Sequence, residues 1–196
     1  MRQFPLLNKI KFNHERVIFS LIYFSLSVTA LSLKIHQTPA WYSGLLISNH
    51  QKLMAIQFTN NEQSRLLQFL VPEFFHRVLG IYIENGYALA RLLFVFLAFL
   101  SFHFFLRKWF SPAESFVGVL ILSGALPIAF QVSDLQESAP LLMLMFVLCM
   151  WAIREGKDTL YCVFLLVGGG LTNETLLAIA AVHFSCKGCF GWCLSS

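Results

Sequence analysis

Long apolar runs separated by short polar segments dominate the pattern of this chain. Four runs, at residues 17–33, 87–106, 112–130 and 139–153, each hold at most one Asp, Glu, Lys or Arg. Their lengths are close to the roughly 20 residues that a helix needs to cross a bilayer core. With a fifth run at residues 159–184, the pattern predicts an all-α fold, a polytopic transmembrane helix bundle of about 5 spans.

The fifth run is broken in the middle by glycine and by polar side chains. A glycine triplet at residues 168–170 is followed by Thr172, Asn173 and Glu174. One tilted span would bury a costly charge at this polar break. Two half-helices that meet there would need protein or a water-filled cavity around the break. The two alternatives place the C-terminus on opposite sides of the membrane, and both stay open.

Composition agrees with the membrane prediction and argues against nucleic-acid binding. The chain is 57% hydrophobic and only 12% charged, outside the range of soluble domains. Its formal charge of +4 comes from basic residues that lie in small groups beside the apolar runs. A nucleic-acid-binding domain would instead gather them on one face. We therefore expect no nucleic-acid partner.

The basic residues also predict the orientation of the spans. Short cytoplasmic loops carry an excess of Lys and Arg. Residues 131–138 contain neither, whereas three other segments are basic: Arg2, Lys9, Lys11 and Arg16; Arg107 and Lys108; Arg154 and Lys157. This predicts a multi-pass protein of the plasma membrane, the inner membrane in a bacterium, with a cytoplasmic N-terminus at residues 1–16. The turn at 131–138 is then extracytoplasmic.

The first apolar run has a second interpretation as a cleavable signal peptide. Ala30 ends a Val-Thr-Ala sequence where a peptidase could cut. The run continues to Leu33, however, which favours an uncleaved anchor as span 1, at residues 17–34.

Residues 35–86 form the longest polar segment and are predicted to be an extracytoplasmic loop with an interfacial amphipathic helix. Its polar stripe recurs every three or four residues, with apolar residues between: Arg65, Gln68, Pro72, His76, Gly80 and Glu84. Such a pattern is typical of a helix lying in the membrane interface. We expect Pro72 to kink or restart this helix. Glu73 and Arg77 are spaced to pair on a solvated helix face.

Two ionisable side chains lie inside the second apolar run. His103 is close enough to the cytoplasmic end to reach the interface by snorkelling. Arg91 is predicted to face the bundle or a wet cavity, as charges in spans usually do. Glu84, seven residues earlier, is its candidate partner. The next span has a clear start, because Ser111-Pro112-Ala113-Glu114 is a capping box with proline at the first helical position.

The last residues contain the only cysteine pattern in the chain. His183, Cys186, Cys189 and Cys193 give H-x2-C-x2-C-x3-C. Without a second ligand pair this spacing is a weak metal signal, so we predict no metal site there. Residues 185–196 follow the bundle of residues 87–184, and we interpret them as a Cys-rich tail, the product of a truncation or frame shift.

Short motifs follow one another in a recognisable order across residues 65–184. They are Phe69-Leu-Val-Pro72, Tyr87-Ala-Leu-Ala-Arg91-Leu-Leu, Arg107-Lys-Trp-Phe-Ser-Pro-Ala, Ala125-Leu-Pro127, Ser133-Asp134 and Gly170-Leu-Thr-Asn-Glu-Thr175. Their order and spacing resemble the GT-C class of membrane glycosyltransferases, such as the protein mannosyltransferases and the bacterial lipid A aminoarabinose transferases. The resemblance implies transfer of a sugar from a polyprenyl-phosphate donor at the extracytoplasmic face, with membrane lipid and the lipid-linked donor as partners.

The resemblance also implies the acids of the site. Asp134 matches the acid at the start of the fourth span, which helps to bind a metal or to orient an acceptor. A second acid is expected in the first outer loop, but no aspartate precedes Asp134 in this chain. Glu62 is the loop acid that we assign to this place, so the predicted catalytic residues are Asp134 and Glu62. A divalent cation is the cofactor to be considered.

Two arginines and the polar break complete the predicted site. Arg65 and Arg91 would stabilise the phosphate of the donor as it leaves. Thr172 and Glu174 fall where the class often has a Thr-Lys pair, and Asn173 replaces the lysine. Members of the class have more spans than this chain, so we interpret it as an N-terminal, incomplete or inactive portion. The alternative is a non-enzymatic integral membrane subunit or a small transporter module.

Overall fold

The computed structural model describes residues 5–39, 41–57, 65–133 and 138–171, and every regular element within them is helical. The predicted all-α fold is therefore confirmed for this part of the chain. The helices are α1 (Pro5–Gln37), α2 (Leu46–Met54), α3 (Leu67–Leu79), α4 (Ile83–Leu106), α5 (Pro112–Ser133), α6 (Ala139–Arg154) and α7 (Asp158–Leu165), with π-helical turns at Trp41–Leu45 and Leu166–Gly170.

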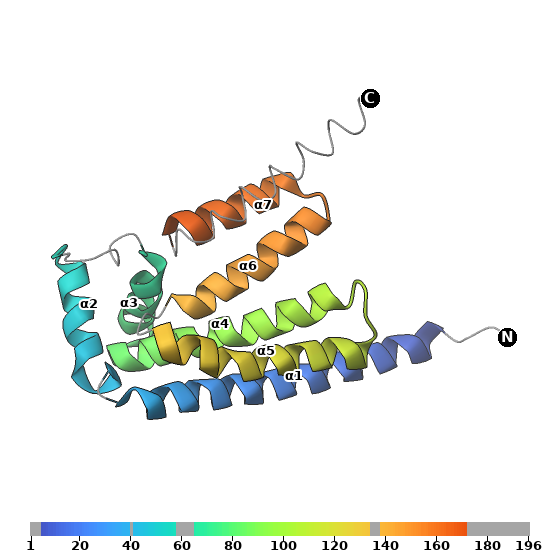
Figure 1. The fold of residues 1–196 in the computed structure, drawn as a ribbon, viewed down its shortest axis with the longest axis horizontal. Helices are drawn as coiled ribbons and strands as arrows, with labels where there is room; N and C mark the ends of the chain where they lie inside the picture. Colours follow the sequence, from blue (N-terminus) through green and yellow to red (C-terminus); the bar gives the residue numbers. More distant parts are fainter. Residues whose placement is uncertain (1–4, 40, 58–64, 134–137, 172–196) are drawn as a thin grey trace.

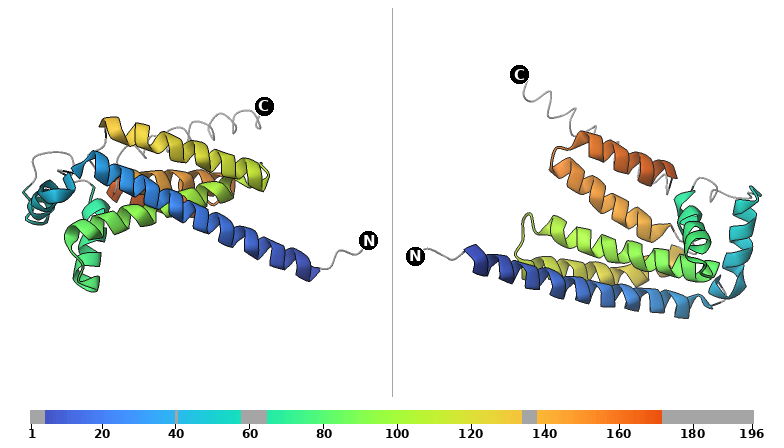
Figure 2. Two further views of the ribbon diagram at one scale, coloured as in Figure 1. Left: turned by 90° about the horizontal axis from the view of Figure 1, so that it is seen from below. Right: turned by 180° about the vertical axis from the view of Figure 1, so that it is seen from behind.

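Five helices lie side by side, and two stand across one end of them. α1, α4, α5, α6 and α7 run lengthwise through the molecule, while α2 and α3 close one end (Figures 1 and 2). The start of α1 and the connections α4–α5 and α6–α7 lie at the opposite end (Figure 1). We call these the α2–α3 end and the loop end. Arg107, Lys108, Arg154 and Lys157 belong to the loop end.

Two helices of the described chain are long and apolar enough to cross a membrane. They are Glu15–Gln37 within α1 and Ile83–Leu106, which is α4, with 23 and 24 residues. Three further apolar segments are shorter: Pro112–Ala125, Ala139–Arg154 and Asp158–Gly170. The count of about 5 spans stays a prediction.

Helix α4 is the centre of the core. Its Val95 and Phe99 pack with Tyr23 of α1 and Val119 of α5. On another face, its Ala98 packs with Leu141 and Leu144 of α6. The outward faces are also apolar. Examples of large exposed side chains are Val17, Ile18 and Leu21 of α1, Phe74 and Val78 of α3, Val117 and Ile121 of α5, Phe146 of α6, and Leu160 and Val163 of α7.

The start of α5 confirms the predicted capping box. The backbone N–H of Ser111 donates to Glu114 Oε2 at 2.8 Å, and the N–H of Glu114 donates to Ser111 Oγ at 3.3 Å. Pro112 occupies the first helical position, where its missing N–H costs nothing. The cap therefore fixes where the connection from α4 ends.

The broken fifth run is only partly described. α7 is followed by the π-helical turn Leu166–Gly170, in which Gly168 and Gly169 are buried. The polar break formed by Thr172, Asn173 and Glu174 lies outside the described residues, as does the tail at 185–196. The choice between one tilted span and two half-helices stays open.

Candidate functional site

The α2–α3 end holds those predicted site residues that the structure describes. Arg65 precedes α3 and Arg91 lies in α4. The predicted acids Glu62 and Asp134 lie outside the described residues. The site is therefore built here from its arginines and from the side chains around them.

The polar stripe of α3 points in an unexpected direction. Its spacing is as predicted, but Gln68 and Pro72 are buried against the bundle, and Arg65 is only 8% exposed. The apolar side chains Leu70 and Phe74 face outward instead. The first half of the predicted stripe, at Arg65, Gln68 and Pro72, is therefore buried.

The packing of α3 on α4 depends on one close approach. A Cβ placed on Gly86 would lie 2.9 Å from the carbonyl oxygen of Pro72, so only glycine allows the two backbones to come this near. The helix continues through Pro72, so of the two predicted effects, a kink or a restart, the restart is wrong. The approach brings Phe69 of α3 against Tyr87 of α4.

Arg91 faces the bundle, as predicted. Its side chain is 4% exposed. Leu67, two residues after Arg65, and Phe94, three residues after Arg91, pack on the same core cluster, which includes Leu141 of α6. Both arginines are therefore buried, and they belong to segments that pack together at this junction of α3, α4 and α6. The suggested partner Glu84 makes no ion pair with Arg91, although both residues are described.

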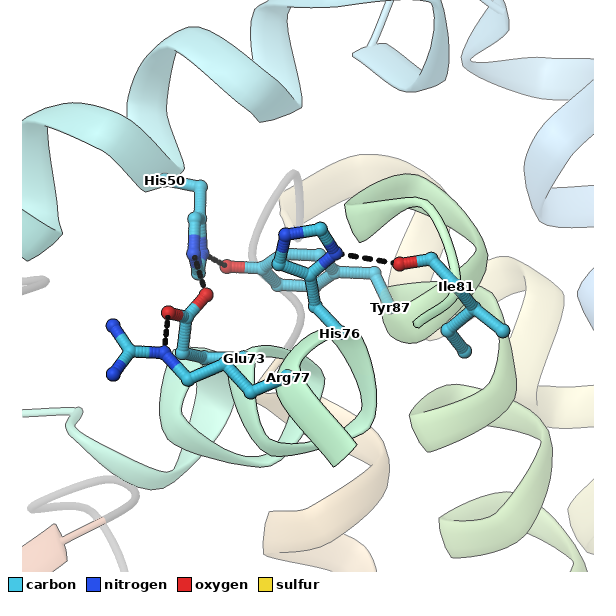
Figure 3. Close-up of polar contacts among 6 residues, drawn as sticks. All are labelled: His50, Glu73, His76, Arg77, Ile81 and Tyr87. Atoms are coloured by element: carbon cyan, nitrogen blue, oxygen red, sulfur yellow. Dashed lines mark hydrogen bonds and ion pairs between the residues drawn. The ribbon is translucent and has the colours of Figure 1, made fainter. Parts of the chain in front are cut away.

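A chain of hydrogen bonds joins α2, α3 and α4 at the α2–α3 end. His50 of α2 stands between Glu73 of α3 and Tyr87 of α4 (Figure 3). Its Nε2 lies 3.0 Å from Glu73 Oε2, and its Nδ1 lies 3.0 Å from the Tyr87 hydroxyl. The Nε of Arg77 donates to the other oxygen of Glu73. We call these three side chains the Glu73–His50–Tyr87 chain.

The charge of Glu73 sets the direction of these bonds. Burial raises the pKa of Glu73, but the hydrogen bonds and charges of Arg77 and His50 outweigh burial and lower the pKa below its ordinary value of 4.5. An ionised carboxylate only accepts hydrogen bonds, so Nε2 of His50 carries a proton. In the neutral imidazole Nδ1 then accepts the hydrogen bond from Tyr87.

Sequence reasoning found half of this arrangement. The i,i+4 pair of Glu73 and Arg77 is present, and Arg77 is 70% exposed as expected of a solvated face. Glu73 itself is only 14% exposed, because His50 and α2 cover it. His50 is 23 positions from Glu73 and 37 from Tyr87, so no local pattern connects them.

His103 faces the interior of the bundle, so its predicted snorkelling is wrong. It is 4% exposed, and its Nδ1 lies 2.6 Å from the hydroxyl of Tyr23 in α1. Ser27 of α1 donates a hydrogen bond to the carbonyl of Tyr23 at 2.7 Å. His103 therefore joins α1 to α4 inside the bundle.

The loop end has polar contacts of a different kind. Lys108 Nζ lies 2.7 Å from Glu155 Oε1. The guanidinium of Arg154 lies 5.0 Å from the ring centroid of Trp109, a cation–π contact. Beside them, α6 and α7 form an open pocket of about 120 Å³ lined mainly by apolar side chains, among them Leu148 and Phe164.

Metal binding is not decided by the described residues. Within residues 5–39, 41–57, 65–133 and 138–171, no three His, Cys, Asp or Glu side chains are grouped closely enough to hold an ion. Asp134 and three of the tail residues considered as ligands, Cys186, Cys189 and Cys193, lie outside these ranges. The divalent cation stays a prediction.

Comparison with known proteins adds no relative. No protein-family model, no curated protein and no solved structure matches this chain. The resemblance to the GT-C class therefore rests on the sequence motifs alone.

Proposed function

We propose that this protein is a multi-pass membrane protein that binds a lipid-linked phosphate at its α2–α3 end and, like the GT-C class, transfers a sugar from a polyprenyl-phosphate donor there. The observation that carries the proposal is the burial of both Arg65 and Arg91, which are 8% and 4% exposed. Both were predicted from the sequence as the donor phosphate-binding residues.

The outward faces of the helices support a lipid environment. Large apolar side chains are exposed along α1, α5 and α7, for example Leu21 at 63% and Ile121 at 69%. Soluble proteins rarely expose contiguous apolar surfaces of this kind. With the basic residues at the loop end, the positive-inside rule gives a cytoplasmic N-terminus and an extracytoplasmic α2–α3 end in the inner membrane of a bacterium.

The chemistry of the junction suits a sugar phosphate. Guanidinium groups bind phosphate through two parallel hydrogen bonds, and two of them offset the charge of a phosphate ester. Charged residues inside a membrane bundle usually mark a substrate path. Gln68, three residues after Arg65, is also buried, and its Oε1 has no hydrogen-bond partner among the described residues. That oxygen is suited to accept a hydrogen bond from a sugar hydroxyl.

Phosphate binding is tested with lipids that differ only in the phosphate. The full chain in nanodiscs is titrated with farnesyl phosphate and with farnesol. We expect the phosphate to bind more tightly, and Arg65→Gln and Arg91→Gln each to weaken its binding about tenfold, since a hydrogen bond to a charged group is worth about 1.5–3 kcal/mol. Arg154→Gln, at the exposed loop end, is the matched control. Equal binding of phosphate and alcohol would overturn the proposal.

Transfer is a separate measurement on the same protein. A labelled polyprenyl-phosphate sugar is incubated with the chain and a hydroxyl acceptor, and sugar on the acceptor is counted. We expect Asp134→Ala to abolish transfer; full activity in that variant would remove Asp134 from the mechanism. Phosphate binding without any transfer would favour the non-enzymatic membrane subunit instead.

A further inference from the structure

We infer that the open pocket between α6 and α7 is a binding site for one anionic phospholipid of the surrounding leaflet, with the phosphate at Lys157 and a segment of one acyl chain between the two helices. We call it the loop-end pocket. It is separate from the lipid-phosphate site at the α2–α3 end. The inference uses the proposed membrane setting but not the proposed sugar transfer.

The loop-end pocket combines apolar walls with two charged side chains. Leu148, Leu160 and Phe164 are among the apolar residues that line it, and Glu155 and Lys157 are its charged residues. Its volume is about 120 Å³. An apolar cavity of about 150 Å³ can hold a molecule the size of benzene. The pocket therefore fits a short segment of one acyl chain.

The lining residues are ordered along the helices. α6 runs toward the loop end and α7 runs away from it (Figure 1). Leu148 precedes Glu155 by seven residues, and Phe164 follows Lys157 by seven residues. At a helical rise of about 1.5 Å per residue, both apolar residues lie about 10 Å further from the loop end than the charged ones. This is the polarity of a phospholipid whose headgroup is at the loop end and whose chain runs along the helices.

Lys157 is the cation that a phosphate can reach in this pocket. Its side chain is exposed and makes no ion pair with another described residue. The neighbouring cations are already engaged, since Lys108 pairs with Glu155 and the guanidinium of Arg154 lies over the ring of Trp109. An ammonium group is a common phosphate ligand in proteins.

The acid in the pocket does not prevent anion binding. Glu155 Oε1 lies 2.7 Å from Lys108 Nζ, so its negative charge is offset by that lysine. The two connections at this end, residues 107–111 and 154–158, hold four basic and two acidic residues. Basic pockets between helices at the cytoplasmic surface bind anionic headgroups, and the proposed orientation places the loop end at that surface.

The pocket is open to the side on which lipid is expected. Leu160 lines the pocket and is 44% exposed. Phe146 of α6 and Val163 of α7 are also exposed, at 49% and 46%. An acyl chain in the pocket would therefore continue onto apolar surface of the same two helices. A small soluble anion would leave these walls uncovered.

A general attraction of the loop end to an anionic leaflet would need no pocket. It would depend on Arg107 as much as on Lys157, because both are exposed cations at this end. Arg107 does not line the loop-end pocket, and its guanidinium donates a hydrogen bond to the carbonyl of Phe110. A specific site should therefore respond to loss of Lys157 and not to loss of Arg107.

The test is photolabelling of the full chain in phosphatidylcholine nanodiscs. A minor fraction of the lipid is phosphatidylglycerol with a diazirine in one acyl chain, and labelled residues are quantified by mass spectrometry. Phosphatidylcholine with the same chain is the comparison probe. We expect about fivefold more label on Leu148 and Phe164 from the anionic probe, the factor that one lysine near an anionic lipid contributes.

Two variants complete the test. Lys157→Gln should reduce the label from the anionic probe about fivefold, to the level of phosphatidylcholine, whereas the matched control Arg107→Gln should leave it nearly unchanged. Equal labelling by the two probes, or equal losses in the two variants, would overturn the inference. Label confined to outward side chains such as Ile121 would also overturn it, and would leave the proposed membrane setting intact. A chain without any label would contradict both.

Discussion

The two ends of the helix array use the same kinds of side chain in opposite settings. At the α2–α3 end the pair His50–Glu73 is covered, with side chains 7% and 14% exposed. At the loop end the pair Lys108–Glu155 is 39% and 33% exposed. Exposed ion pairs contribute little to stability. Breaking a buried pair lowers the stability much more, because the remaining partner is left uncompensated in the low-dielectric interior. Burial, and not the number of charges, decides which end is sensitive to substitution.

Glu73→Gln should have the largest effect. It removes the carboxylate that accepts hydrogen bonds from both His50 and Arg77. Each hydrogen bond to a charged group contributes about 1.5–3 kcal/mol, so we expect the unfolding free energy to fall by about 3 kcal/mol. The measurement is unfolding by SDS titration in detergent. Because the pKa of Glu73 is lowered on folding, its stabilisation is present above pH 4.5 and is lost as the pH falls further.

Glu84→Gln is the matched control for that variant. Glu84 also lies at the α2–α3 end but has no ion pair among the described residues. We expect Glu84→Gln to leave the unfolding free energy almost unchanged. Equal losses in the two variants would mean that burial does not distinguish them.

Gly86→Ala should have the second largest effect. The new methyl group would meet the Pro72 carbonyl at 2.9 Å, and backbone atoms cannot move aside without shifting α3, so we expect a loss of about 2 kcal/mol. Gly118→Ala is the comparison, since its methyl group would meet the flexible end of the Leu106 side chain. Both are measured by the same titration. A larger loss for Gly118→Ala would contradict the close approach of α3 and α4.

Tyr23→Phe should have a smaller effect. It removes the hydroxyl that lies 2.6 Å from His103 between α1 and α4. Hydrogen bonds between helices in membranes contribute about 0.6–1.7 kcal/mol, so we expect a loss of about 1 kcal/mol. Tyr82→Phe, on an exposed tyrosine, should change nothing. A double variant with His103→Phe that loses the sum of the two single effects would show that the bond contributes no coupling.

Lys108→Ala should have the smallest effect, visible mainly as a pH dependence. The hydrogen bond and charge of Lys108 lower the pKa of Glu155, so the pair stabilises the fold above pH 4.5 and less as the pH falls below it. The difference in melting temperature between wild type and variant should therefore shrink in acid and in 1 M salt. Lys52→Ala serves as control. A difference in melting temperature that grows in acid would contradict this role of the Lys108–Glu155 pair.

Local features of the fold were predictable because their causes are local. The residues of the Ser111–Glu114 cap are three apart, and the cap gave the start of α5 correctly. Apolar run length likewise located α4 and α6 within a few residues. The direction of the α3 stripe was not predictable, since periodicity defines a face but not the element that covers it. Gln68 is buried, and a pattern within α3 cannot show which element covers it.

The same limit applies to the site. Arg91 was predicted to face the bundle because a charged side chain in an apolar run is costly to expose to lipid. The side chain is indeed buried in the bundle. Glu73 and Arg77 were found because they are one helical turn apart. His50 was missed, since its partners are far along the chain. Its isolated position in a polar segment gave no signal that would separate it from His36 or His76.

The position of His50 in the chain also determines when α2 can dock during synthesis. His50 leaves the ribosome 23 residues before Glu73 and 37 residues before Tyr87. At about 5–20 residues per second, α2 waits about 2–7 s for the second of these partners. Throughout that interval its attachment to the bundle is incomplete. The α2–α3 end is therefore assembled only after the first turns of α4 have been made, although α2 is among the first helices to be synthesised.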